Sequence, residues 1–144
     1  MLGKTNAWIA FFAWFLIVTL LSSQDGISTV QASGRIVSFL MRVFNIPARY
    51  RSPLHITLRT LAHVVCFCVL GALLYLAMFV TWGQTQSVRW WAVGVCVVLG
   101  VMDEVKKLFV TGRHLSWTEA GINIGSAWFG IVATMMALHI FYRR

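Results

Sequence analysis

Charged residues are scarce in this chain of 144 residues, of which only 11% are Asp, Glu, Lys or Arg and 59% are hydrophobic. A soluble domain carries about 25% charged residues, so the composition excludes an ordinary water-facing fold. With a mean hydropathy of +0.78, most of the chain is expected to be in contact with lipid. We therefore predict an all-α integral membrane protein that forms one transmembrane domain over residues 1–144.

Acidic residues and cysteines are also few. Four acids stand against twelve Lys and Arg, for a net charge of +8, but the basic residues are scattered over loops and helix ends. This distribution argues against nucleic acid and for anionic lipid headgroups as partners. The three cysteines, Cys66, Cys68 and Cys96, lie in predicted spans without disulfide or zinc spacing, so we expect them to act as small apolar residues.

Long apolar runs predict about four transmembrane helices, because a helix needs roughly 20 residues to cross a bilayer. They are expected near residues 7–22, 55–82, 89–109 and 117–142. The first run is short enough for a signal peptide, but its bulky aromatic residues and the sequence Ser22-Ser23-Gln24, which offers no cleavage site, favour a retained anchor. Four spans place both termini on one side of the membrane.

The connector after the first span contains an amphipathic segment near residues 35–46. Its polar side chains recur every three or four residues, at Arg35, Ser38, Arg42 and Asn45. This period predicts either a helix in the membrane interface or a surface helix packed on the bundle. Pro47 is expected to end it. Ser52 is then expected to be the N-cap of the next helix, with Pro53 in its first position.

Polar residues of the later spans are expected to gather at the side opposite the termini. The residues concerned are Arg59, His63, Asp103, Glu104, Arg113, Glu119 and Asn123. The side of the termini collects Trp8, Trp82, Trp90, Trp91 and Tyr142, an aromatic belt.

Two local patterns mark the last span. Ser116-Trp117-Thr118-Glu119 is a capping box, in which serine and glutamate bind each other's backbone N–H groups. Four small residues, Gly121, Gly125, Ser126 and Gly130, form two stripes that allow close approach of another helix, either within the chain or in an oligomer.

The stretch from Asp103 to Gly130 resembles the VanZ-like membrane proteins, named for an accessory protein of teicoplanin resistance. The shared pattern is an acidic pair closing one helix, the Gly112-Arg113 turn, an acid opening the next helix, and then Asn123 with small residues. The family often has glutamine where Lys107 stands and aspartate where Glu119 stands.

Two segments further upstream are also similar to that family. Arg59-x-x-x-His63 resembles its Arg/Lys-x-x-x-His helix opening, and Trp14 to Ser23 resembles its first span. The resemblance implies a multi-pass protein of the bacterial inner membrane, possible involvement in glycopeptide antibiotic resistance, and both termini in the cytoplasm.

Ionisable residues near hydrocarbon cost roughly 2.5–3.5 kcal/mol each, so they face the bundle interior and find partners there. One hypothesis is a pocket that binds an anionic, lipid-linked envelope component, with Arg59, Asp103, Arg113, Glu119 and Asn123 as ligand-binding residues. A second is a membrane enzyme acting on a lipid headgroup. A third is a structural subunit of an envelope complex, in which paired charges only fix the helices.

The enzyme hypothesis assigns acid–base roles to His63 and Glu104. Imidazole exchanges protons near neutral pH, and Asp103 is expected to pair with Lys107 and leave Glu104 available. Glu119 is expected to serve mainly as the cap. A metal site could be assembled from His63, Asp103, Glu104 and His114, but no pair of them has a recognised ligand spacing, so neither a metal nor a cofactor is expected.

Charge counting and the family resemblance give opposite orientations. Most Lys and Arg residues lie on the side opposite the termini, which by the positive-inside rule would be cytoplasmic. Arg35 and Arg42 are expected on an interfacial helix, and Arg59 and Arg113 are expected to be neutralised in the pocket. Without these four arginines, the two sides carry nearly equal numbers of Lys and Arg residues. We therefore follow the family resemblance and adopt the orientation with cytoplasmic termini.

Overall fold

A computed structural model describes residues 3–23, 26–112 and 114–142, and all regular secondary structure in these ranges is helical. The predicted all-α class is therefore confirmed. The α-helices are α1 (Lys4–Ser22), α2 (Gly26–Val43), α3 (Arg51–Trp82), α4 (Gln86–Lys106) and α5 (Trp117–Tyr142). Two short 3-10 helices, η1 (Ala48–Tyr50) and η2 (Lys107–Phe109), precede α3 and follow α4.

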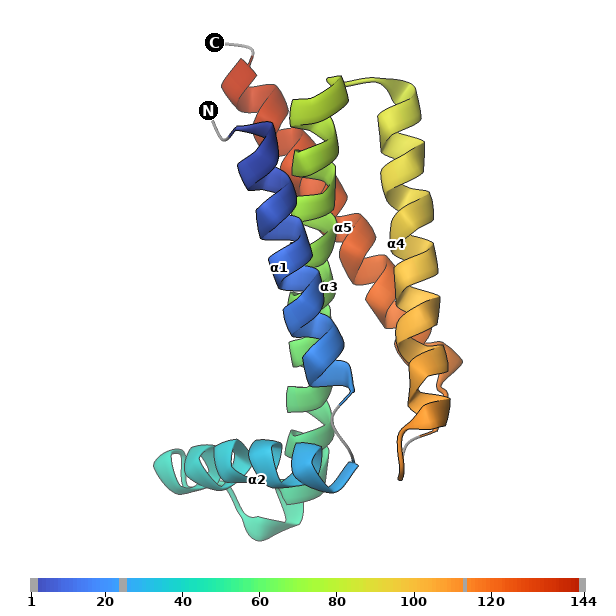
Figure 1. Ribbon diagram of the computed structural model, residues 1–144. Helices are drawn as coiled ribbons and strands as arrows, with labels where there is room; N and C mark the ends of the chain where they lie inside the picture. Colours follow the sequence, from blue (N-terminus) through green and yellow to red (C-terminus); the bar gives the residue numbers. More distant parts are fainter. Residues whose placement is uncertain (1–2, 24–25, 113, 143–144) are drawn as a thin grey trace.

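Four helices run along the long axis of the molecule, and α2 lies across it at one end (Figure 1). We call this the α2 end, and the opposite one the terminal end, because α1 begins and α5 finishes there. Gly83, whose φ of +79° suits glycine, ends α3 and leads through a short turn into α4. The predicted placement of both termini at one end of the bundle is confirmed.

Three helical segments of the described chain are long and apolar enough to cross a membrane. They are Lys4–Ser22, Ala48–Trp82 and Trp117–Phe141. The fourth predicted span corresponds to α4, which is not among the three. Arg89 near its start and Asp103 and Glu104 near its end leave a shorter uncharged stretch than the other three helices have.

The helix predicted near residues 35–46 is α2, and it begins much earlier, at Gly26, and finishes at Val43. It therefore stops before Pro47. Asn45 has a φ of +50°, and the Ile46 N–H donates to the Met41 carbonyl at 2.9 Å, which is the Schellman arrangement that closes a helix.

Large apolar side chains of α2 are exposed. Val37 is buried, but Ile36, Phe39, Val43 and Phe44 are all more than half exposed. A surface helix packed on the bundle would bury these residues, so the exposure favours the interfacial alternative.

The start of α3 differs from the prediction that Ser52 caps it. The helix begins at Arg51 directly after η1, and Tyr50 occupies the cap position without a side-chain hydrogen bond. Pro53 lies in the first turn, where a helix does not need the missing N–H group.

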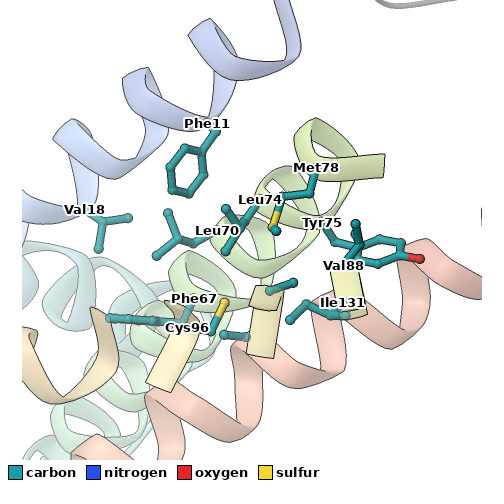
Figure 2. Close-up of a cluster of buried hydrophobic side chains, with 12 residues drawn as sticks. Phe11, Val18, Phe67, Leu70, Leu74, Tyr75, Met78, Val88, Cys96 and Ile131 are labelled. Carbon is teal, nitrogen blue, oxygen red and sulfur yellow. The ribbon is translucent and has the colours of Figure 1, made fainter. Parts of the chain in front are cut away.

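The core forms where α3 packs between its neighbours. Phe11 of α1, Phe67, Leu70 and Leu74 of α3 and Ile131 of α5 belong to one buried cluster (Figure 2). At this level α3 and α5 approach so closely that a Cβ on Gly71 would lie 2.1 Å from the Ala127 carbonyl oxygen, and one on Gly130 would lie 1.9 Å from that of Cys68. Two glycines thus make the crossing possible.

Tryptophans attach α1 to α3. The Trp8 indole donates to Thr81 Oγ1 at 3.0 Å, and its ring meets Trp82 edge-on with centroids 5.9 Å apart. Further along, the Trp14 indole donates to the Cys66 carbonyl at 2.9 Å. Trp8 and Trp82 lie at the terminal end, as the aromatic-belt prediction requires.

Candidate functional site

Lys107 is the centre of a charged cluster near the α2 end, built from α3, α4, η2 and α5. Its side chain is 1% exposed, and its ammonium contacts the Glu104 carboxylate and, at 2.6 Å, Glu119 Oε2. Arg59 Nη2 donates to Glu119 Oε1 and Oε2 at 3.1 and 3.0 Å. The four side chains neutralise one another, so the cluster has no net charge.

Glu104 also joins α4 to the beginning of α5. Its Oε2 accepts the Ser116 backbone N–H at 3.2 Å, while Ser116 Oγ accepts the Glu119 N–H at 3.3 Å. The serine half of the predicted capping box is confirmed. The prediction that Glu119 supplies the other half is wrong, because its carboxylate binds Arg59 and Lys107 and Glu104 takes its place.

Asp103 forms a second polar group beside this cluster. It is 4% exposed, lies 3.4 Å from Lys106 Nζ, and accepts from Asn123 Nδ2 at 3.5 Å. The expected pairing of Asp103 with Lys107 is therefore wrong, since each acid pairs with the lysine three residues further on.

A cavity of about 10 Å³ lies between α3 and α5, roughly the space of one water molecule. Its lining residues are Arg59, Thr60, His63, Glu119, Ile122 and Asn123. Arg59 Nε and the fully buried Asn123 Oδ1 have no hydrogen-bond partner within the described parts of the chain. Two residues of the lining thus carry one unused donor and one unused acceptor.

The residues predicted to converge do so in part. Arg59, His63 and Asn123 line the same cavity, with Glu119 beside them. Glu104 lies outside this lining and is 0% exposed, held by Lys107 and Ser116. It is therefore not available for the acid–base role proposed with His63.

The remaining candidate site residues lie outside this cluster or outside the described residues. Arg113 lies outside the described residues. His114 is exposed in the loop before α5, and within the described ranges no group of three or more His, Cys, Asp or Glu side chains is placed to hold a metal ion.

The sequence analysis did not identify Lys107 as the centre of the site. The i, i+3 spacing from Glu104 indicated local pairing, but it gave no sign that Lys107 would also bind Glu119 from the next helix. A lysine so close to an apolar span was itself a signal, since such a charge needs a buried partner.

The small residues of α5 divide between two environments. Ser126 and Gly130 are buried, and Gly130 packs against α3, so this stripe serves the fold. Gly121 and Gly125 are exposed, and a Cβ added at either would meet no atom within 4 Å.

Fold and site together define a helical protein with three candidate membrane-spanning helices and a partly buried, internally neutralised charged cluster at one end. Comparisons with protein-family models, with curated proteins and with solved structures find no match for this chain.

Proposed function

We propose that this chain is a VanZ-like protein of the bacterial inner membrane that binds an anionic, lipid-linked component of the cell envelope at its α2 end. In this proposal α4 is the fourth transmembrane helix and α2 lies in the membrane interface. The motif resemblance in residues 103–130 and the exposed apolar side chains of α2 support these two parts.

The main support for the binding proposal is the incomplete hydrogen bonding of the Arg59 guanidinium. This guanidinium uses Nη2 on Glu119 and leaves Nε without a partner among the described residues, in the wall of a cavity. A guanidinium binds phosphate or carboxylate oxygens through paired N–H groups. Asn123 Oδ1, also without a partner there, is an acceptor that a hydroxyl of the ligand would satisfy.

The small size of the cavity defines how binding would proceed. A phosphate does not fit into about 10 Å³, so the anionic group competes with Glu119 for Arg59. The Glu119 side chain is about one third exposed, which leaves it room to turn aside, while Lys107 keeps its contact with Glu104.

Exposed arginines near the same end strengthen the attraction. Arg35, Arg42, Arg49 and Arg51 are all exposed, and the salt bridges of the described residues engage none of them. Basic residues at a membrane surface attract anionic lipids by about 1 kcal/mol each.

The test is mass spectrometry of lipids that copurify with the full chain extracted from bacterial membranes. We expect an anionic lipid other than a bulk phospholipid, reduced about tenfold by Arg59→Leu and increased by Glu119→Gln, which weakens the competitor. Lys4→Leu, which removes an exposed cation at the opposite, terminal end, is the matched control and should leave the lipid in place. Recovery of bulk phospholipids alone, in membrane proportions, would refute the proposal.

A further inference from the structure

A groove runs along α3 between α1 and α4, away from the cavity at Arg59. Towards the terminal end it opens to about 640 Å³, lined by residues that include Phe11, Leu74 and Val95. Towards the α2 end it narrows to about 160 Å³, lined by residues that include Phe15, Leu70 and Leu99. Each residue of the second set lies one helical turn from its counterpart in the first, so the two spaces follow one another along the same three helices, and together we call them the groove.

The lining is apolar except at the α2 end. There the narrow part is bordered by Thr19, Asp103 and Lys106. Lys106 Nζ lies 3.4 Å from Asp103 Oδ1 and 3.5 Å from the Thr19 carbonyl, and the Lys106 side chain is about one third exposed. Both contacts are long, and an ammonium has three donors, so Lys106 retains the capacity to bind an oxygen from outside.

From this geometry we infer that the groove holds one acyl chain of an anionic phospholipid, with the lipid phosphate against Lys106 and the chain along Met102, Leu99 and Val95. The helix between Val95 and Lys106 rises about 16 Å at 1.5 Å per residue. One leaflet of a bilayer has about half of the ~30 Å hydrocarbon thickness, so the length fits one chain entering from the α2 end.

Charge and position support an anionic lipid. The exposed arginines of α2, η1 and the start of α3 lie at the end of the molecule where Lys106 borders the groove (Figure 1). Apolar contacts alone distinguish poorly between a groove and bulk lipid, since lipid tails are as apolar as leucine. We therefore expect the groove to select its lipid by the fit of the acyl chain and by contacts between the anionic headgroup and cationic side chains.

One hydrogen bond links the lining of the groove to the lining of the cavity at Arg59. Asp103 borders the groove, and it accepts from Asn123, which lines the cavity. A ligand with its hydrocarbon chain in the groove would thus hold its headgroup beside the charged cluster. The inference deepens the proposed function, on which it rests for its biological meaning, by assigning a place to the lipid part of the ligand.

Native mass spectrometry of the full chain in detergent, with equal amounts of phosphatidylglycerol and phosphatidylethanolamine, tests the inference. We expect retention of one phosphatidylglycerol, reduced about tenfold by Leu99→Trp, which fills the narrow part of the groove. The matched control is Val98→Trp, one residue earlier and 55% exposed on the outside of α4, which should retain the lipid.

Headgroup variants probe the cationic end of the groove. Lys106→Gln should remove the preference for phosphatidylglycerol, and Lys106→Arg should keep it. Equal retention of both lipids by the wild type, or equal loss in Leu99→Trp and Val98→Trp, would overturn the inference.

A second measurement needs no variant and applies even where Leu99→Trp does not fold. Phosphatidylglycerol with a diazirine on its acyl chain should crosslink the wild-type chain within Phe67–Leu70 or Leu99–Met102. Crosslinks only on outward residues such as Val98 would contradict the groove. Arg59→Leu should leave this crosslinking intact, so a failure of the proposed function can be distinguished from a failure of the groove.

Discussion

The Glu104 carboxylate caps the helix that begins after Ser116, because its Oε2 accepts the Ser116 backbone N–H at 3.2 Å. A residue at the end of α4 therefore performs the task that the capping-box pattern assigns to Glu119 of α5 itself. Because Glu104 caps the helix, the Glu119 carboxylate is free to bind Arg59 of α3 and Lys107 of η2. The α2 end of the bundle is thereby tied together by one set of charged residues.

Removing Lys107 should destabilise the protein strongly. Lys107→Met leaves the fully buried Glu104 without its cation, and breaking a buried ion pair on one side costs about 3–5 kcal/mol. Equilibrium unfolding in mixed detergent and SDS micelles measures this loss.

The matched control for that experiment is Arg51→Met, an exposed position of α3 that should change the free energy of unfolding by less than about 0.5 kcal/mol. The double variant Lys107→Met, Glu104→Met should be more stable than the single one, since it removes the unpaired charge. A single variant as stable as the wild type would mean that the cluster does not stabilise the fold.

Two glycine substitutions on α5 should have opposite effects. Gly130→Ala places a Cβ 1.9 Å from the Cys68 carbonyl oxygen and forces α3 and α5 apart, so we expect a loss of about 1–3 kcal/mol. Gly125→Ala meets no atom within 4 Å and should be neutral or stabilising by up to about 1 kcal/mol. Thermal unfolding in one detergent compares them, and equal midpoints would contradict the close crossing.

Accessibility to a charged maleimide should distinguish the residues of α2. If α2 lies in the interface, a cysteine at Phe39 is in the lipid and reacts slowly, whereas one at Arg42 faces water and reacts fast. Both native side chains are exposed in the isolated chain, so a water-exposed helix would give similar rates. The labelling is measured in proteoliposomes, with the three native cysteines replaced by alanine.

Reporter fusions after Arg144 test the proposed orientation. With both termini in the cytoplasm, a fluorescent-protein fusion should be bright and an alkaline phosphatase fusion inactive. Four exposed arginines near the α2 end, Arg35, Arg42, Arg49 and Arg51, favour the reverse orientation by charge. An active phosphatase would show that these charges determine the topology.

Much of the fold follows from local sequence signals. The last helix was predicted at its observed bounds, Trp117–Tyr142, because Ser116 marks its start and apolar residues continue to its end. The start of α2 was missed, because residues 26–34 are mostly small or polar, with Ile27 and Val30 as their only large apolar side chains. The apolar run that identifies the other helices is absent there.

The charged cluster could be predicted only in outline. Spacing allowed Lys107 to pair with either Asp103 or Glu104, and the approach of α5 decides between them, since Ser116 and Glu119 both lie on the side of Glu104. Glu119 had a local partner in Ser116, but two cations from other elements bind its carboxylate instead. Choices of this kind depend on tertiary structure and leave no trace in local sequence patterns.

In the proposed four-span topology, the ion pairs at the end of α4 and the start of η2 have a consequence for membrane insertion. Asp103 pairs with Lys106 and Glu104 with Lys107, each at i, i+3 spacing, so both pairs form as soon as this turn is helical. A ribosome delivers α4 to the translocon before α5 emerges. In that topology α4 therefore presents a turn with four charged groups and no net charge, and it needs no later helix to neutralise it.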